Sequence, residues 1–164
     1  EARASFRRML FEGGCLTPSA SLIRREMFER AGGVCEEPEM LTAEDYDLWL
    51  RLAFASARFT FLDDFLTDYR LHDSNASSSI TIHMNATLWI VDHHYRNLER
   101  PSVLDALRRR RRRAFVYHGA ARNSLRADNS AEAICFSWAS LMAYPFIPRA
   151  YANLALALMN RVTP

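Results

Sequence analysis

The pattern of apolar and polar residues along the chain changes in character near residue 80. Before that point, β-prone runs alternate with helix-forming ones. Three runs suit strands: residues 16–23, 58–62 and 65–71. Residues 24–31 contain strong helix formers, and the adjacent Gly32 and Gly33 can end a helix because glycine accepts a positive φ. This alternation predicts a mixed α/β region.

The clearest helix of this region is predicted to begin near residue 42. Thr42, followed three residues later by Asp45, has the spacing of a capping box. Leu48, Trp49 and Leu52 then fall on one face at helical spacing. We therefore expect an amphipathic helix that starts at Thr42 and carries several acidic residues in its first turns.

After residue 79 the whole chain reads as helical. Four helices are predicted: residues 80–98, residues 101–126 opened by Pro101, residues 130–143 capped by Ser130, and residues 148–160 opened by Pro148. The last two are apolar enough to pack on each other or to lie in a membrane interface, and packing is favoured because Pro145 interrupts any span. The sequence thus predicts an α/β part, residues 1–79, followed by an all-α tail, residues 80–164.

Composition narrows the class of protein. The chain has 164 residues, of which 49% are hydrophobic and 24% charged, with a net charge of +2, a balance that excludes disorder for most of its length. The three cysteines are too few and too scattered for a disulfide framework, so we expect reduced thiols in a cytoplasmic protein. The chain begins with Glu1 and carries no signal-peptide pattern, so it is expected to be a piece of a longer protein.

Charge divides the chain unevenly. Residues 1–100 carry 11 Arg against 16 acidic residues, a net of −5, whereas residues 101–164 carry 10 Arg against 3, a net of +7. Six arginines run from Arg108 to Arg113, but on a helix they surround the axis, and an apolar stripe containing Leu104, Leu107 and Phe115 passes through them. A solvated surface is favoured over a nucleic-acid site, and contact with acidic lipid head groups stays open.

The acidic residues near position 45 allow two interpretations. Asp45 can complete the capping box, and Asp47 can form a surface ion pair with Arg51 four residues later. Alternatively, a carboxylate at a helix N-terminus stays ionised, faces a cleft and accepts a proton from an alcohol. The histidines, including the adjacent His93 and His94, are expected at the surface or partly buried rather than on a metal.

Three separate blocks of the sequence add a resemblance. They lie in residues 11–33, in residues 43–53 with the string Glu-Asp-Tyr-Asp-Leu-Trp-Leu-Arg, and in residues 61–72, which end in Tyr-Arg-Leu-His. In order and spacing they resemble the acceptor-side half of family 2 glycosyltransferases, which make bacterial cell-surface polysaccharides. The resemblance covers about residues 8–79. It implies the C-terminal half of a GT-A domain, the nucleotide-diphospho-sugar transferase fold, followed by the helical tail.

The resemblance also implies roles for particular residues. Asp45 takes the place of the general base that activates the acceptor hydroxyl, and Glu44 that of a residue shaping the acceptor site. Arg70 and His72 match residues near the nucleotide diphosphate, where His72 could also bind metal. The cofactor implied is a divalent metal, Mg or Mn, held mainly by a nucleotide-binding half expected before residue 1.

The function implied is inverting transfer of a sugar from a nucleotide-sugar donor to a hydroxyl of a glycan or lipid-linked acceptor. One base opposite the leaving group suits a single displacement with inversion. Two departures from the family are Val34-Cys35-Glu36 in place of Phe-Asp-Glu, and the lack of an Asp-x-Asp motif before Asp45. The string Gln-x-x-Arg-Trp of processive synthases is also missing, which favours a non-processive enzyme.

A second interpretation belongs to another class of protein. In it the chain is a non-catalytic helical interaction module, and the Glu44-Asp45 pair only caps a helix. An upstream nucleotide-binding region with Asp-x-Asp would favour the enzyme. For the enzyme we expect a cytoplasmic location, with peripheral contact at the inner membrane face.

Overall fold

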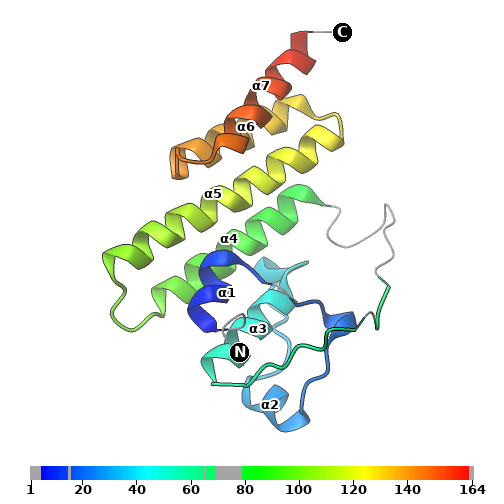
Figure 1. The fold of residues 1–164 in the computed structure, drawn as a ribbon, viewed down its shortest axis with the longest axis vertical. Coiled ribbons are helices and arrows are strands. Elements are labelled where there is room, and N and C mark those ends of the chain that lie inside the picture. The colour runs from blue at the N-terminus through cyan, green and yellow to red at the C-terminus, as the bar shows by residue number, and fades with distance from the viewer. Residues whose placement is uncertain (1–4, 15, 65, 69–78, 163–164) are drawn as a thin grey trace. The chain divides into compact units, whose positions relative to one another are not determined.

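The computed structural model describes residues 5–14, 16–64, 66–68 and 79–162 (Figure 1). These residues form α-helices and two short 3-10 turns, and none of them lies in a strand. The helices are α1 (Phe6–Glu12), α2 (Arg25–Arg30), α3 (Glu44–Phe54), α4 (Ile80–Arg96), α5 (Val103–Arg126), α6 (Ser130–Ala143) and α7 (Pro148–Val162), and the 3-10 turns are η2 (Pro18–Ala20) and η3 (Pro38–Met40).

The predicted α/β class, and with it the GT-A half-domain, is wrong. Residues 16–23 contain the 3-10 turn η2, which Pro18 opens, and residues 58–62 have no regular secondary structure. A strand needs a neighbouring strand to satisfy its backbone groups, and the described residues offer none to the segment 58–62. Of the third expected strand, residues 66–68 are irregular and the rest lies outside the described residues.

The chain divides into two compact units, Glu1–His94 and Tyr95–Pro164. In the first unit α1 packs against α3, and the hydroxyl of Tyr46 in α3 donates a hydrogen bond to the carbonyl oxygen of Met9 at 2.8 Å. Met9 in α1 and Leu50 in α3 are fully buried, as is Ile90 in α4. The start of α3 is therefore held by a buried core on the side that faces α1.

The short helix α2 confirms the helix predicted at residues 24–31. It ends before Gly32 and Gly33, whose φ angles of 81° and 70° are in the left-handed region that side chains disfavour. The backbone N–H of Gly33 donates to the carbonyl of Phe28 at 3.0 Å, so the two glycines close the helix and redirect the chain.

The four tail helices are confirmed to within a few residues. Ser102 and Asp105 form a complete capping box at the start of α5, and α7 begins at Pro148 as predicted. The cap of α6 is Asn129 rather than Ser130: its side-chain oxygen accepts from the backbone N–H of Glu132. No helix in the described part of the chain is long and apolar enough to cross a membrane.

In the second unit α5, α6 and α7 pack together (Figure 1), and the side chains between them are mostly small. Eight residues of this contact are buried to 0% exposure: Ala114, Ala121, Ser124, Ala133, Ser137, Ser140, Ala150 and Ala157. The apolar stripe predicted on α5 is not the buried face, since Leu104 and Leu107 are 52% and 47% exposed. Small residues are preferred inside because they let the helix backbones approach closely, as the hydrogen bond of 2.8 Å from Ser140 Oγ to the carbonyl of Ala114 indicates.

Candidate functional site at the start of α3

The turn that precedes α3 differs from the predicted capping box. The N-cap position is Ala43, no side chain caps the helix, and Thr42 has a φ of 75°. Positive φ is strained for a β-branched residue, at a cost of about 1–3 kcal/mol. His83 in α4 stabilises this turn: its Nδ1 donates to the carbonyl of Thr42 at 2.9 Å and lies 3.2 Å from the threonine hydroxyl. The predicted capping box does not form, because Thr42 instead binds His83, which lies 41 residues later in the chain.

Asp45 lies in the first turn of α3 and is partly buried. Its Oδ1 accepts the backbone N–H of Tyr46 at 2.7 Å. Burial and the neighbouring charge of Glu44 raise the pKa of Asp45, and they outweigh the Tyr46 hydrogen bond and the attraction of His83. The carboxylate is thus a stronger base than an ordinary aspartate.

Glu44 adds a second carboxylate at the same place. Its Oε2 atom is buried and accepts no hydrogen bond from the described residues. Leaving such an oxygen without a donor costs about 1–3 kcal/mol, and a ligand hydroxyl would reach this buried atom only after the side chain changed rotamer.

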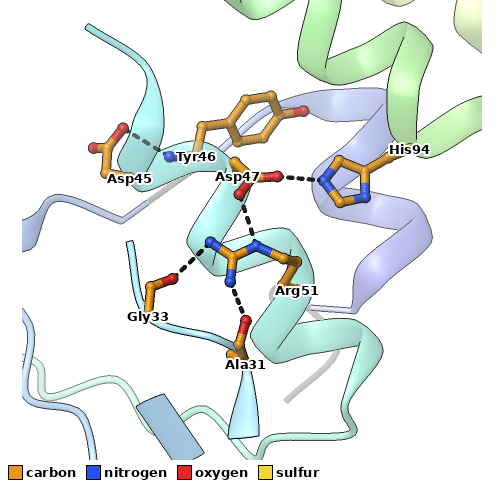
Figure 2. Close-up of polar contacts among 7 residues, drawn as sticks. All are labelled: Ala31, Gly33, Asp45, Tyr46, Asp47, Arg51 and His94. Carbon is orange, nitrogen blue, oxygen red and sulfur yellow. Dashed lines mark hydrogen bonds and ion pairs between the residues drawn. The ribbon is translucent and has the colours of Figure 1, made fainter. Parts of the chain in front are cut away.

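Asp47, by contrast, is buried, and both of its carboxylate oxygens are hydrogen-bonded. It is 2% exposed, its Oδ1 accepts from His94 Nε2 at 2.7 Å, and its Oδ2 accepts from Arg51 Nε at 2.7 Å (Figure 2). Burial opposes ionisation, but these two hydrogen bonds outweigh it and lower the pKa of Asp47. The predicted pairing with Arg51 is confirmed, whereas its expected place on the surface is wrong.

Arg51 extends this network to the turn after α2. Its NH2 nitrogen donates to the carbonyl of Gly33 at 2.8 Å, and its NH1 nitrogen donates to the carbonyl of Ala31. One guanidinium therefore connects the buried carboxylate of Asp47 to the end of α2, through the fixed fork of donors that only arginine supplies. The network fixes the glycine turn relative to α3.

The helix separates the two aspartates by function. Residues two apart on a helix point about 200° apart, and Figure 2 shows Asp45 directed away from the cluster of Asp47, Arg51 and His94. The cluster is a structural anchor, while Glu44 and Asp45 are partly buried carboxylates outside it, and Asp45 is bound by the backbone N–H of Tyr46. This pair can accept a proton and orient a hydroxyl.

The other predicted site residues, Arg70 and His72, lie outside the described residues. Their expected proximity to Asp45 stays a prediction. Among the described residues no group of three or more His, Cys, Asp or Glu side chains could hold a metal ion. Metal ligation by His72 is likewise a prediction of the resemblance alone.

Sequence reasoning missed the roles of His83 and His94. Both were expected to be surface or partly buried histidines, yet His83 holds the strained turn before Asp45 and His94 binds Asp47. The two are 11 residues apart on α4, three helical turns, so both meet α3 from one face of that helix. The spacing of 11 residues is the feature of the sequence from which their position on one face of α4 could have been predicted.

Comparison of the chain with protein-family models, with curated proteins and with solved structures found no match.

Proposed function

We propose that the start of α3 supplies the general base of an inverting, non-processive glycosyl transfer, with Asp45 accepting the proton of the acceptor hydroxyl and Glu44 orienting that hydroxyl. The donor is a nucleotide sugar and the acceptor a glycan or lipid-linked hydroxyl. The resemblance of three sequence blocks, from residue 8 to residue 79, supports the choice of reaction. The proposal concerns the chemistry of these residues and does not require the overall fold that the resemblance implied.

The observation that carries the proposal is the contrast between two aspartates in one helix. Asp47 has both carboxylate oxygens occupied and a lowered pKa, so it is a poor base. Asp45 is partly buried, is bound through a backbone N–H, and has a raised pKa. A general base works best when its pKa lies closer to the working pH, which favours Asp45.

The reaction follows from these properties. The acceptor oxygen attacks the anomeric carbon, the bond to the diphosphate oxygen breaks, and the acceptor proton passes to Asp45. The nucleoside diphosphate leaves with the electron pair of the broken bond. Glu44, which is partly buried in the same turn, is proposed to accept a hydrogen bond from the acceptor and so hold it in line for attack.

Several parts of the proposal concern residues outside this site. Arg70 and His72 are proposed to bind the diphosphate, and a divalent metal, Mg or Mn, is proposed to supply charge stabilisation there when bound. A lipid-linked acceptor places the reaction at the cytoplasmic face of the inner membrane, where the arginines from Arg108 to Arg113 can contact acidic lipid head groups.

The test is the release of nucleoside diphosphate by the complete protein, supplied with a panel of nucleotide sugars and a mixture of lipid-linked and glycan acceptors. Asp45→Asn is expected to lower turnover by about 10²- to 10⁴-fold, because the amide keeps the shape of the carboxylate but cannot take up a proton. Donor affinity should stay within about twofold of the wild type, since the base contacts the acceptor.

Glu44→Gln is the matched control for charge at this site. It keeps an acceptor oxygen for the hydroxyl, so turnover should fall by less than about tenfold. Donor affinity that falls as steeply as turnover in Asp45→Asn would place this carboxylate on the nucleotide side. Unchanged turnover in Asp45→Asn would contradict the proposal.

A non-catalytic interaction module is the second candidate. The exposed apolar side chains of α6 and α7, among them Trp138, Phe146 and Tyr151 at 59%, 78% and 52% exposure, favour it. A complete protein that transfers no sugar from any donor, while still binding a partner through these helices, would make this candidate the better account.

A further inference from the structure

The pair α6 and α7 has large apolar side chains on its outside and small ones on its inside. Its buried residues are mainly alanine and serine, and its exposed residues include Trp138, Met142, Phe146, Tyr151, Leu156 and Leu158. A helical bundle in water places its large apolar side chains in the core, where their burial stabilises the fold. In this pair many of the large apolar side chains lie on the outside instead, and Leu141 and Ile147 are buried exceptions.

The exposed apolar residues form continuous faces. On α6, Ala131, Cys135, Trp138 and Met142 are exposed at intervals of four, three and four residues, which places them in one stripe. On α7, the exposed Tyr151, Ala155 and Leu158 follow at intervals of four and three residues, which places them in one stripe as well. The turn between the helices continues the surface, since Phe146 is 78% exposed and its ring meets that of Tyr144 edge to face, with centroids 5.4 Å apart.

Helices can associate through small residues and interhelical hydrogen bonds, which leaves their large apolar side chains for the surroundings. The second unit has both: Ser140 Oγ donates to the carbonyl of Ala114 at 2.8 Å, and Asn153 Nδ2 lies 3.0 Å from His118 Nδ1. Aromatic side chains such as Trp138 and Tyr151 are those that settle at the level of lipid head groups.

The net charge of the second unit indicates which kind of partner this surface binds. Residues 95–164 carry 12 Arg against 4 acidic residues, a net of +8, and one of the four, Asp105, is 1% exposed. Two copies of such a unit repel each other, whereas an anionic surface attracts it. Arginines also flank the exposed Phe146: Arg149 follows in the first turn of α7, and Arg110 Nε donates to the carbonyl of Ala143 at the end of α6.

We propose that the α6–α7 face, defined by Trp138, Met142, Phe146, Tyr151 and Leu158, docks on the surface of a bilayer that contains anionic phospholipid. The apolar side chains enter the head-group region of one leaflet, and Arg110 and Arg149 bind lipid phosphates. The helices have 14 and 15 residues, which suits helices lying in the interface. The proposal is independent of the role of Asp45, which lies in the other unit.

Flotation of the 164-residue chain with lipid vesicles tests the docking. We expect binding to phosphatidylcholine vesicles that contain about 30% phosphatidylglycerol at about 0.1 M salt, and weaker binding to phosphatidylcholine alone or at about 0.5 M salt. Brominated lipid should quench the fluorescence of Trp138, and this part of the quenching should disappear in Trp138→Phe. Absence of binding to the anionic vesicles would overturn the proposal.

Substitutions at exposed positions locate the surface without disturbing the core. Phe146→Ser and Leu158→Ser should each weaken binding by about tenfold, and Arg149→Gln should weaken it by about fivefold on anionic vesicles only. Leu22→Ser, which removes a fully exposed apolar side chain from the first unit, should bind like the wild type. Circular dichroism checks that each variant keeps its helices.

The alternative occupants give different results. A second copy of the chain would appear as a dimer in light scattering that Phe146→Ser dissociates, without vesicle binding. Equal loss of vesicle binding in Leu22→Ser would mean that general apolarity, rather than this face, causes adsorption. Either result overturns the docking surface.

Discussion

At the scale of single residues, the largest effect on stability is expected at Asp47. Its carboxylate is 2% exposed and neutralises Arg51 while accepting from His94. Asp47→Asn leaves that guanidinium partly buried without its counter-charge, so the free energy of unfolding should fall by about 3 kcal/mol at pH 7. Urea unfolding followed by tryptophan fluorescence in a Trp138→Phe background measures the first unit alone, because Trp49 and Trp89 both lie there.

Glu12→Gln is the control, because Arg8 and Glu12 form the same kind of pair four residues apart but are 47% and 57% exposed. In Glu12→Gln the free energy of unfolding should fall by less than about 1 kcal/mol. The lowered pKa of Asp47 means that its contribution is present above the unfolded pKa of about 3.9 and is lost as the pH falls through the lower folded value. The difference between wild type and Asp47→Asn should therefore shrink below about pH 4, and a difference that stays constant to pH 2 would contradict this account.

Asp45 should behave in the opposite way. Its pKa is raised in the folded state, so the folded state binds the proton more tightly and ionisation destabilises it as the pH rises above about 4. Asp45→Asn should therefore raise the free energy of unfolding at pH 7, and the gain should disappear at pH 3. The same urea titrations measure it. A variant that is less stable than the wild type at pH 7 would show that the carboxylate acts as a structural cap.

At the scale of elements, the sequence predicts helices well where their signals are local. Pro148 opens α7 and Gly32 ends the region of α2, both as expected, while the start of α5, predicted at Pro101, is set by the capping box of Ser102 and Asp105. Each of these signals depends on residues within about four positions, so it does not require contacts with distant parts of the chain. These elements could be predicted from the sequence alone.

The failed predictions depend on distant partners. Residues 58–62 have high β-propensity, but this propensity reflects fit against neighbouring strands, and none is present among the described residues. Thr42 has the right spacing for a cap, yet His83 binds its hydroxyl. The sequence predicts that Asp47 forms a surface pair with Arg51. In the structure, His94, 47 residues later in the chain, binds the Asp47 carboxylate in the interior. The sequence alone predicts the candidate site at Asp45. The burial and the hydrogen bonds that make Asp47 a poor base are visible only in the structure.

At the scale of the whole molecule, the two units should be separable. Their boundary falls between His94 and Tyr95, within the last turn of α4, and each unit has its own buried residues. Helix α6 packs against both α5 and α7, and α5 contributes Ala114, Ala121 and Ser124 to the buried residues of the second unit. A chain that holds three packed helices and its own capping box has the local signals it needs to fold by itself.

Residues 95–164 expressed alone are therefore expected to be helical and to unfold in one cooperative thermal transition, measured by circular dichroism at 222 nm. Ala121→Asp places an unpaired charge at a position with 0% exposure, which should cost more than about 3 kcal/mol and abolish the transition. Asn123→Asp introduces the same carboxylate two residues away at an exposed position of α5, and its transition should stay within a few degrees of the unsubstituted unit. If both variants melted alike, the small-residue contact between α5, α6 and α7 would not be what holds this unit together. Absence of a cooperative transition in the unsubstituted fragment would mean that its helices depend on the first unit for their stability.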